Sequence, residues 1–206
     1  HITTSEEMDF LRKNKDVASV ELLANHLTLH SPDCYERLGS LAQQNPPIRE
    51  KHHQDALWKA LNSGIVDIIA SDHAPHTLKE KQNLYTLSPS GGPLVQHALI
   101  ALLTLAQKGK ITLEKLVEKA CHNPAILFRI QNRGYLREGY FADLVLLDTN
   151  KENHVNKENI LYKCGWSPFE GHSFKTTIDT TIVNGTIVYE KGALTGAIVG
   201  RRMTYN

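Results

Sequence analysis

The stretch IVDIIASDHAPHT, residues 65–77, decides the predicted fold of this chain. It begins with mainly apolar, β-branched residues and ends in serine, aspartate and two histidines. A run of this kind is typical of a strand that is buried on both faces of a parallel sheet. Because polar side chains able to bind a metal follow the run directly, the stretch predicts a strand that ends in an active site.

Upstream of this stretch, the apolar pattern alternates between helix and strand. A helix is predicted over residues 5–15, where Thr4 and Glu7 have the spacing of a capping box. The segment SVELLA, residues 19–24, predicts a short buried strand that ends just before His26. His1 precedes the first helix, where the loop after a strand would lie.

The alternation continues on both sides of residues 65–77. A short strand is predicted over 41–45, because the proline pair that follows stops any regular element. Helices are predicted over 50–63, over 93–107 and from Thr112 onward. Alternating strands and helices indicate an α/β fold with parallel βα units.

After residue 133 the pattern changes to a β-rich one. The segments ADLVLLD (142–148) and TIDTTIVNGTIVYEKG (177–192) read as strands, and Asn184-Gly185 is a strong type I′ hairpin signal. We therefore expect two domains, a β/α domain over 1–133 and a small β-rich domain over 134–206.

Composition excludes several classes of protein. Lys and Arg number 23 against 22 Asp and Glu, so no large field would attract nucleic acid or an anionic membrane. The longest apolar stretch, 94–106, is shorter than the roughly 20 residues that span a bilayer, and the polar start is not a signal peptide. Three scattered cysteines argue against a disulfide framework or a zinc ribbon. A cytoplasmic protein is expected.

Three potential metal ligands, His1, His26 and Asp72, each follow a predicted strand or strand-end loop. In a β/α barrel the carboxyl ends of the strands share one face, where the active site is built. Imidazoles and a carboxylate without a thiolate suit Zn²⁺ in a catalytic site with a position open for water. Such an ion lowers the pKa of bound water from about 15.7 toward 7, and Asp72 could then shuttle protons.

Several motifs together resemble dihydroorotase of the amidohydrolase superfamily. The resemblance covers nearly the whole chain in the right order: HLTL (26–29), NPPIR (45–49), SDHAPHTLKEK (71–81), SPSGGP (88–93) and REGYFADLVLLD (137–148). SDHAPH is the most specific of these motifs. The resemblance implies the C-terminal half of a (β/α)8 TIM-like barrel, about strands five to eight, followed by a small β-rich domain.

The resemblance also implies the chemistry. His1 and His26 would bind one or two zinc ions after barrel strands five and six. Asp72, after strand eight, would also be linked to the metal, would take the proton from the attacking water and would deliver it to the leaving amide nitrogen. The implied reaction is the reversible cyclisation of N-carbamoyl-L-aspartate to L-dihydroorotate in pyrimidine synthesis.

The substrate contacts implied by the resemblance are Asn45, His76 and the backbone around Gly91 and Gly92. A purely structural role stays open for each of them. Asn45 could only cap the turn before Pro46, and His76 could brace its own loop. The two glycines could belong to a flexible lid or supply backbone donors to the ligand.

Two elements of the family are not found in this sequence. These are the His-x-His metal pair of the first barrel strand and the lysine, after the fourth, whose carbamate bridges two metals. We therefore expect an N-terminal portion of the same enzyme outside these residues, and a homodimer, which is common in the family. Alternatives are a hydantoinase- or allantoinase-like enzyme and a non-catalytic homologue that serves as a structural partner of aspartate transcarbamoylase.

Overall fold

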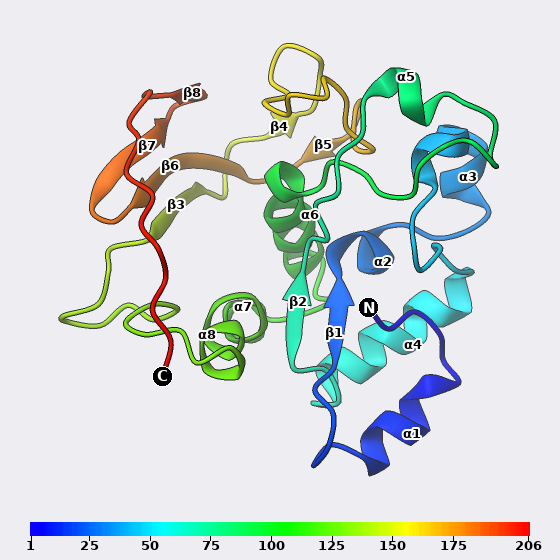
Figure 1. Cartoon of the computed structure of the whole chain (residues 1–206), viewed down its shortest axis with the longest axis horizontal. Coiled ribbons are helices and arrows are strands. Elements are labelled where there is room, and N and C mark those ends of the chain that lie inside the picture. Colours follow the sequence, from blue (N-terminus) through cyan, green and yellow to red (C-terminus); the bar gives the residue numbers. More distant parts are fainter.

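The computed structural model describes residues 1–206, and two short parallel strands lie near its centre (Figure 1). Strand β1 (Glu21–Leu23) pairs with β2 (Ile68–Ala70), with Glu21 opposite Ile68 and Leu23 opposite Ala70. Parallel pairing brings the carboxyl ends of both strands to the same edge. The loop that carries SDHAPH therefore leaves β2 beside the end of β1.

Helices surround this strand pair. In chain order they are α1 (Glu7–Lys13), α2 (Ala24–Thr28), α3 (Asp33–Leu38), the 3-10 helix η1 (Gly39–Ala42), α4 (Lys51–Asn62), α5 (Leu78–Lys81), α6 (Val95–Gln107), α7 (Leu113–Val117), the π-helical turn η2 (Glu118–His122) and α8 (Asn123–Leu127). None of them combines the length and the apolar character needed to cross a membrane. Strands together with this many helices confirm the predicted mixed α/β class.

The second half carries the remaining strands. They are β3 (Leu144–Asp148), β4 (Asn153–His154), β5 (Ser173–Phe174), β6 (Thr177–Val183), β7 (Thr186–Glu190) and β8 (Ala193–Leu194). Strands β3, β6, β7 and β8 form one antiparallel sheet in that order. Asn184 and Gly185 both have positive φ, 49° and 81°, as a type I′ turn requires, so the predicted hairpin forms.

Two hydrophobic clusters stabilise the molecule, and α6 contributes to both. The first joins β1, α4 and α6, with Leu22, Leu57 and Leu102 among its members. The second joins Ile100 of α6 to residues of the second half of the chain, including Phe169. Burying each large apolar side chain contributes roughly 1.5–3 kcal/mol. The segment between β4 and β5 thus packs on the β/α part of the chain, while the boundary near residue 133 stays a prediction.

One predicted strand is wrong. Residues 41–45 do not pair with a sheet; Gly39–Ala42 form a 3-10 helix, and the peptide bond between Asn45 and Pro46 is cis. The run of apolar residues is only Leu41 and Ala42, and the two prolines after Asn45 lack the backbone donors of a ladder. Strand β1 pairs directly with β2 instead.

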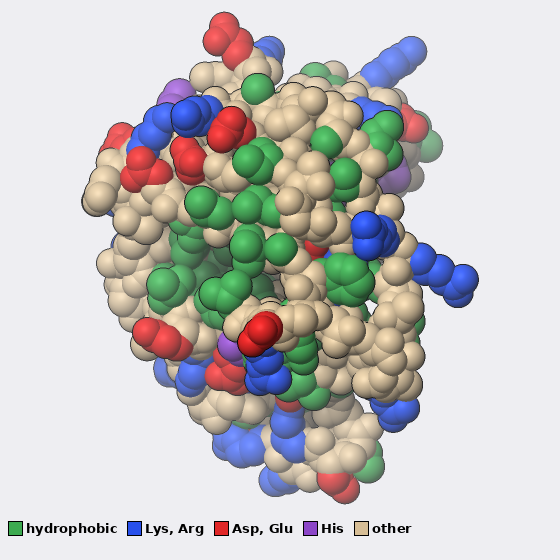
Figure 2. All heavy atoms as spheres, turned by 90° about the vertical axis from the view of Figure 1, so that its left-hand side faces the viewer, with side chains coloured by type: hydrophobic (Ala, Val, Ile, Leu, Met, Phe, Trp, Pro, Cys, Tyr) green, Lys and Arg blue, Asp and Glu red, His purple; other side chains and the backbone are tan.

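The C-terminal sheet leaves apolar side chains exposed. Val145 and Leu146 of β3 and Ile187 of β7 are each more than two-fifths accessible. Figure 2, which views the molecule from the side of this sheet, shows hydrophobic side chains gathered around a hollow. A groove between α7, α8 and β3 is lined mostly by apolar residues, among them Leu116 and Leu144.

Candidate functional site

His1 and Asp72 meet at the edge where β1 and β2 end. The chain start lies beside β1 (Figure 1), because the Ile2 amide donates over 3.1 Å to the carbonyl of Glu21, the first residue of that strand. This contact brings His1 Nε2 to within 3.7 Å of Asp72 Oδ1. Residues 71 positions apart in the sequence are therefore neighbours, as the strand-end argument predicts.

The His1 ring is oriented by a carboxylate. Its Nδ1 lies 2.6 Å from Glu21 Oε1, which accepts the proton of that nitrogen. In neutral imidazole the other nitrogen, Nε2, then carries a lone pair that faces Asp72. A carboxylate behind a histidine fixes the tautomer in this way at many metal sites. The pair can hold either a proton or a cation between Nε2 and Asp72.

Asp72 itself has a left-handed backbone, with φ of +48°. A non-glycine residue in this region costs free energy, and such residues cluster at functional sites. The conformation turns the chain sharply after β2, and the Asp72 side chain is about 29% accessible. Its carboxylate is thus reachable by substrate without being fully solvated.

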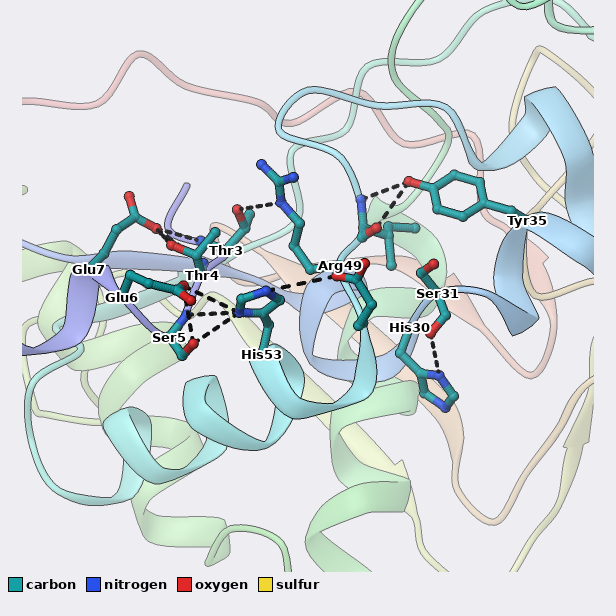
Figure 3. Close-up of polar contacts among 12 residues, drawn as sticks. Thr3, Thr4, Ser5, Glu6, Glu7, His30, Ser31, Tyr35, Arg49 and His53 are labelled. Atoms are coloured by element: carbon teal, nitrogen blue, oxygen red, sulfur yellow. Dashed lines mark hydrogen bonds and ion pairs between the residues drawn. The ribbon is translucent and has the colours of Figure 1, made fainter.

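The segment that follows His1 is fixed against the beginning of α4 (Figure 3). Arg49 Nε donates to Thr3 Oγ1 over 3.4 Å, and the Ser5 amide donates to His53 Nδ1 over 3.0 Å. The His53 side chain is only about 12% accessible, so it does not lie on the exposed face of α4. Its role is to hold residues 3–5 and, through them, His1.

His26 lies in α2, which begins directly after β1, and is almost completely buried. Its Nε2 is 3.1 Å from the Pro46 carbonyl oxygen and 2.6 Å from Gln44 Nε2. The Pro46 carbonyl can accept only from a protonated Nε2, and the Gln44 amide can donate only to an unprotonated one, so two tautomers compete. In both of them Nδ1 is buried without a partner.

Burial lowers the pKa of His26 to about 4, with an opposing contribution from its hydrogen bond to the Pro46 carbonyl. The ring is therefore neutral at pH 7. Neutral imidazole is the form that binds a metal ion. The negative charge of Asp72 acts on His26 as well and opposes the lowering of its pKa.

The donor chemistry of these residues fits zinc only in part. Two tetrahedral ligands at about 2.0–2.1 Å from zinc lie roughly 3.4 Å apart, close to the 3.7 Å between His1 Nε2 and Asp72 Oδ1. The unpartnered Nδ1 of His26 is a further donor. However, no group of three or more His, Cys, Asp or Glu side chains is arranged to hold a metal ion by itself.

Three of the predicted substrate residues, His76, Gly91 and Gly92, lie on two loops that contact each other. His76 Nε2 donates to the Ser90 carbonyl over 3.0 Å, and the Ala74 amide donates to the Gly92 carbonyl over 3.1 Å. These bonds tie the 72–77 loop to the SPSGGP loop. Loop bracing by His76 is therefore observed, and substrate contact by His76 stays a prediction.

Asn45 and the two glycines differ in whether their polar groups are free to bind a ligand. Asn45 is exposed, and its side chain makes no hydrogen bond. Gly91 is buried with φ of +117°, and its amide already donates to the Gln43 carbonyl over 3.0 Å. A Cβ at Gly91 would lie 2.7 Å from the Ala74 carbonyl oxygen, so glycine is required where the two loops touch. Substrate contact by Gly91 and Gly92 stays a prediction.

Sequence reasoning missed three residues that shape this region. Gln44 contacts the ring of His26, Trp166 Nε1 donates to the His76 carbonyl over 2.8 Å, and Lys81 is fully buried. Gln44 and Trp166 carry no motif of their own, and nothing in the sequence around Lys81 predicts its burial. Only their distant partners reveal them.

Known proteins resemble this chain over almost its full length. Residues 1–188 match the amidohydrolase family. A dihydroorotase of Pyrococcus horikoshii is 36% identical over 204 residues, which are 98% of this chain and 47% of that protein. A dihydroorotase of Halobacterium salinarum is 35% identical over 203 residues, again 98% of this chain and 47% of that protein.

Among solved structures, the L-hydantoinase (dihydropyrimidinase) from Arthrobacter aurescens has a TM-score of 0.84 at 29% identity. The match covers 94% of this chain and 45% of the hydantoinase chain. The chain therefore spans about half the length of the relatives that it matches. The agreement of the sequence match with the α/β architecture shows that this chain belongs to the amidohydrolase family.

Proposed function

We propose that these residues form part of a zinc-dependent dihydroorotase, which interconverts N-carbamoyl-L-aspartate and L-dihydroorotate. The observation that carries the proposal is the meeting of His1 with Asp72 at 3.7 Å, to which His26 adds a buried ring that is neutral at pH 7. The names of the curated relatives support the same reaction.

The proposed architecture follows the family. Residues 1–133 would supply about strands five to eight of a (β/α)8 barrel, and 134–206 would form the β-rich domain. The direct parallel pairing of β1 with β2 supports a barrel contribution. As direct neighbours the two strands would be consecutive in the barrel, so His26 would follow strand seven if Asp72 follows strand eight. Homodimerisation and association with aspartate transcarbamoylase stay predictions.

His1, His26 and Asp72 would hold one or two zinc ions together with further ligands from the rest of the enzyme. When bound, zinc would make hydroxide available at neutral pH by lowering the pKa of water. In the hydrolytic direction Asp72 accepts the proton of the attacking water as the oxygen adds to the ring carbonyl. Asp72 then returns the proton to the amide nitrogen as the carbon–nitrogen bond breaks. Cyclisation is the reverse and releases one water molecule.

Asn45, His76 and the backbone at Gly91 and Gly92 would hold the substrate. Asn45 is the best placed of them, because its exposed amide has no partner to give up. His76 would contact substrate with Nδ1, since Nε2 is engaged by the Ser90 carbonyl. Gly92 would contribute its backbone, because its carbonyl and the Ala74 amide already fix its position.

The test is an assay of carbamoyl-aspartate cyclisation by the purified full-length protein that contains these residues. We expect turnover that is lost with a zinc chelator and restored by added zinc. Asp72→Asn keeps the shape of the side chain but not its basicity, so kcat should fall by about 10²-fold or more with little change in folding. Asp9→Asn, on the exposed face of α1, is the matched control and should keep full activity.

A hydantoinase-like activity is the second candidate, because the similar solved structures include hydantoinases. Turnover of hydantoins without turnover of carbamoyl aspartate would replace the first proposal by this one. Absence of both activities in a zinc-loaded, folded protein would instead favour a non-catalytic homologue.

A further inference from the structure

Lys81 is an unusual residue, because it is charged and completely buried. It ends the short helix α5 and has no accessible surface. No acidic side chain forms an ion pair with it; its Nζ donates instead to the Gln43 and Pro89 carbonyls, each over 2.8 Å. Burial lowers its pKa to about 8. Burying an ammonium without a carboxylate is costly compared with an apolar side chain of similar size.

The two carbonyls that Lys81 joins belong to different loops. Gln43 lies two residues before Asn45, and Pro89 lies two residues before Gly91. The Gly91 amide donates to the Gln43 carbonyl over 3.0 Å, so that oxygen accepts from Gly91 as well as from Lys81. Gln43 Nε2 also donates to the Ser88 carbonyl over 3.0 Å. One ammonium therefore lies at the junction of two segments proposed to contact substrate.

The backbone of Lys81 is fixed from the opposite side. Its carbonyl accepts from Ser40 Oγ over 2.5 Å and from Ser88 Oγ over 3.1 Å. Helix α5 is capped by Thr77, which forms a reciprocal capping box with Glu80. Because α5 follows the SDHAPH loop directly, the position of Lys81 is set relative to Asp72 and His76. Its two hydrogen bonds then fix residues 43 and 89 relative to the same two side chains.

The two loops approach each other closely. A Cβ at Gly91 would lie 2.8 Å from Ala74 Cβ, and His76 donates to the neighbouring Ser90 carbonyl. A shift of residues 88–91 would therefore disturb the loop between Asp72 and His76. Through a single atom, Nζ, Lys81 hydrogen-bonds to residue 43 and to residue 89. Because Lys81 belongs to the helix that follows the 72–77 loop, these two bonds connect all three segments.

We propose that Lys81 is a positioning residue, whose ammonium holds the 43–45 and 88–92 segments at the spacing that the substrate requires. A lysine suits this task because its compact ammonium has three donors that can point to separate carbonyls. The inference rests on the proposed function, since Asn45, Gly91 and Gly92 are there assigned to the substrate.

The experiment compares Lys81→Met with Lys79→Met in the full-length protein. Lys79 lies on the same helix but is exposed, so it controls for the loss of a lysine from α5. Hydrogen–deuterium exchange of peptides covering 88–92 should be about tenfold faster in Lys81→Met and unchanged in Lys79→Met. KM for carbamoyl aspartate should rise about tenfold in Lys81→Met, while kcat changes less than about threefold.

Two outcomes would overturn the proposal. One is unchanged exchange over 88–92 in Lys81→Met; the other is a loss of kcat at unchanged KM, which would indicate a role in the chemical step. If Lys81→Met does not fold, Lys81→Gln replaces it, because the amide can still donate to one carbonyl and should give a smaller change in the same direction. A wild-type protein that does not process carbamoyl aspartate would refute the proposed function, whereas the exchange measurement would still decide whether Lys81 holds the loops.

Discussion

His97 illustrates how a single buried ring makes stability depend on pH. Its Nδ1 lies 2.9 Å from Ser167 Oγ and 3.3 Å from Tyr162 Oη, and the ring packs against Phe169 and Phe174. Burial lowers its pKa to about 4, while the unfolded chain titrates near 6.5. Between these values the unfolded state binds more protons than the folded state, so stability is lost as pH falls from about 6.5 to 4.

We therefore expect His97→Gln to flatten this part of the stability profile. The wild-type protein should lose up to about 3 kcal/mol of unfolding free energy across the window through this group. Urea unfolding at several pH values between 7 and 4 measures the slope. His154→Gln, at an exposed position, is the control and should keep the wild-type slope. Equal slopes for wild type and His97→Gln would show that the ring is not held neutral by burial.

At the scale of the elements, the close approach of two loops makes Gly91 sensitive to substitution. Gly91→Ala adds a Cβ at 2.7 Å from a carbonyl oxygen at a φ of +117°, so both strain and a clash oppose folding. Gly109→Ala also has positive φ but open space around it. We expect a loss of about 1 kcal/mol for Gly109→Ala from the backbone alone. Gly91→Ala should lose about 1–3 kcal/mol more from overpacking.

Urea midpoints of the two glycine variants provide the measurement. Equal losses would mean that the loops separate easily and that the contact with Ala74 does not constrain them. In that case Gly91 would matter only for its φ, and the loop would behave as the flexible lid that the sequence left open.

Apolar periodicity and turn residues correctly predict those helices and turns whose structure depends on neighbouring residues alone. The helices over 50–63 and 93–107 form as α4 and α6, since their apolar periodicity spans three turns or more. The Asn184-Gly185 hairpin forms because both residues accept positive φ. The strand predicted over 41–45 fails because strand formation depends on a partner, and nothing in residues 41–45 specifies one.

At the scale of the whole molecule, α6 couples the two halves of the chain. Ile100 packs with Phe169, while Leu102 packs with the cluster around β1 and α4. We expect residues 1–133 and the segment around 153–174 to unfold together, because neither can lose α6 without exposing its own core. This prediction bears directly on the domain boundary near residue 133.

The two tryptophans allow this prediction to be measured. Trp58 lies in the first cluster, and Trp166 lies in the segment that contacts His76. Within residues 1–206, Trp58→Phe leaves Trp166 as the fluorescent tryptophan, and Trp166→Phe leaves Trp58. Each variant should show the same urea midpoint by fluorescence as by circular dichroism. A fluorescence transition that separates from the global one would indicate two independent units.

The sequence by itself determined the α/β class, the long helices, the hairpin and the placement of Asp72 just after a strand. These follow from side-chain periodicity and from turn residues, which act over a few positions. Tertiary structure alone decided that His53 supports residues 3–5 and that Lys81 joins residues 43 and 89. The physical reason is that an isolated helix leaves such polar groups in water. Only burial between distant segments makes their hydrogen bonds obligatory and gives them one geometry.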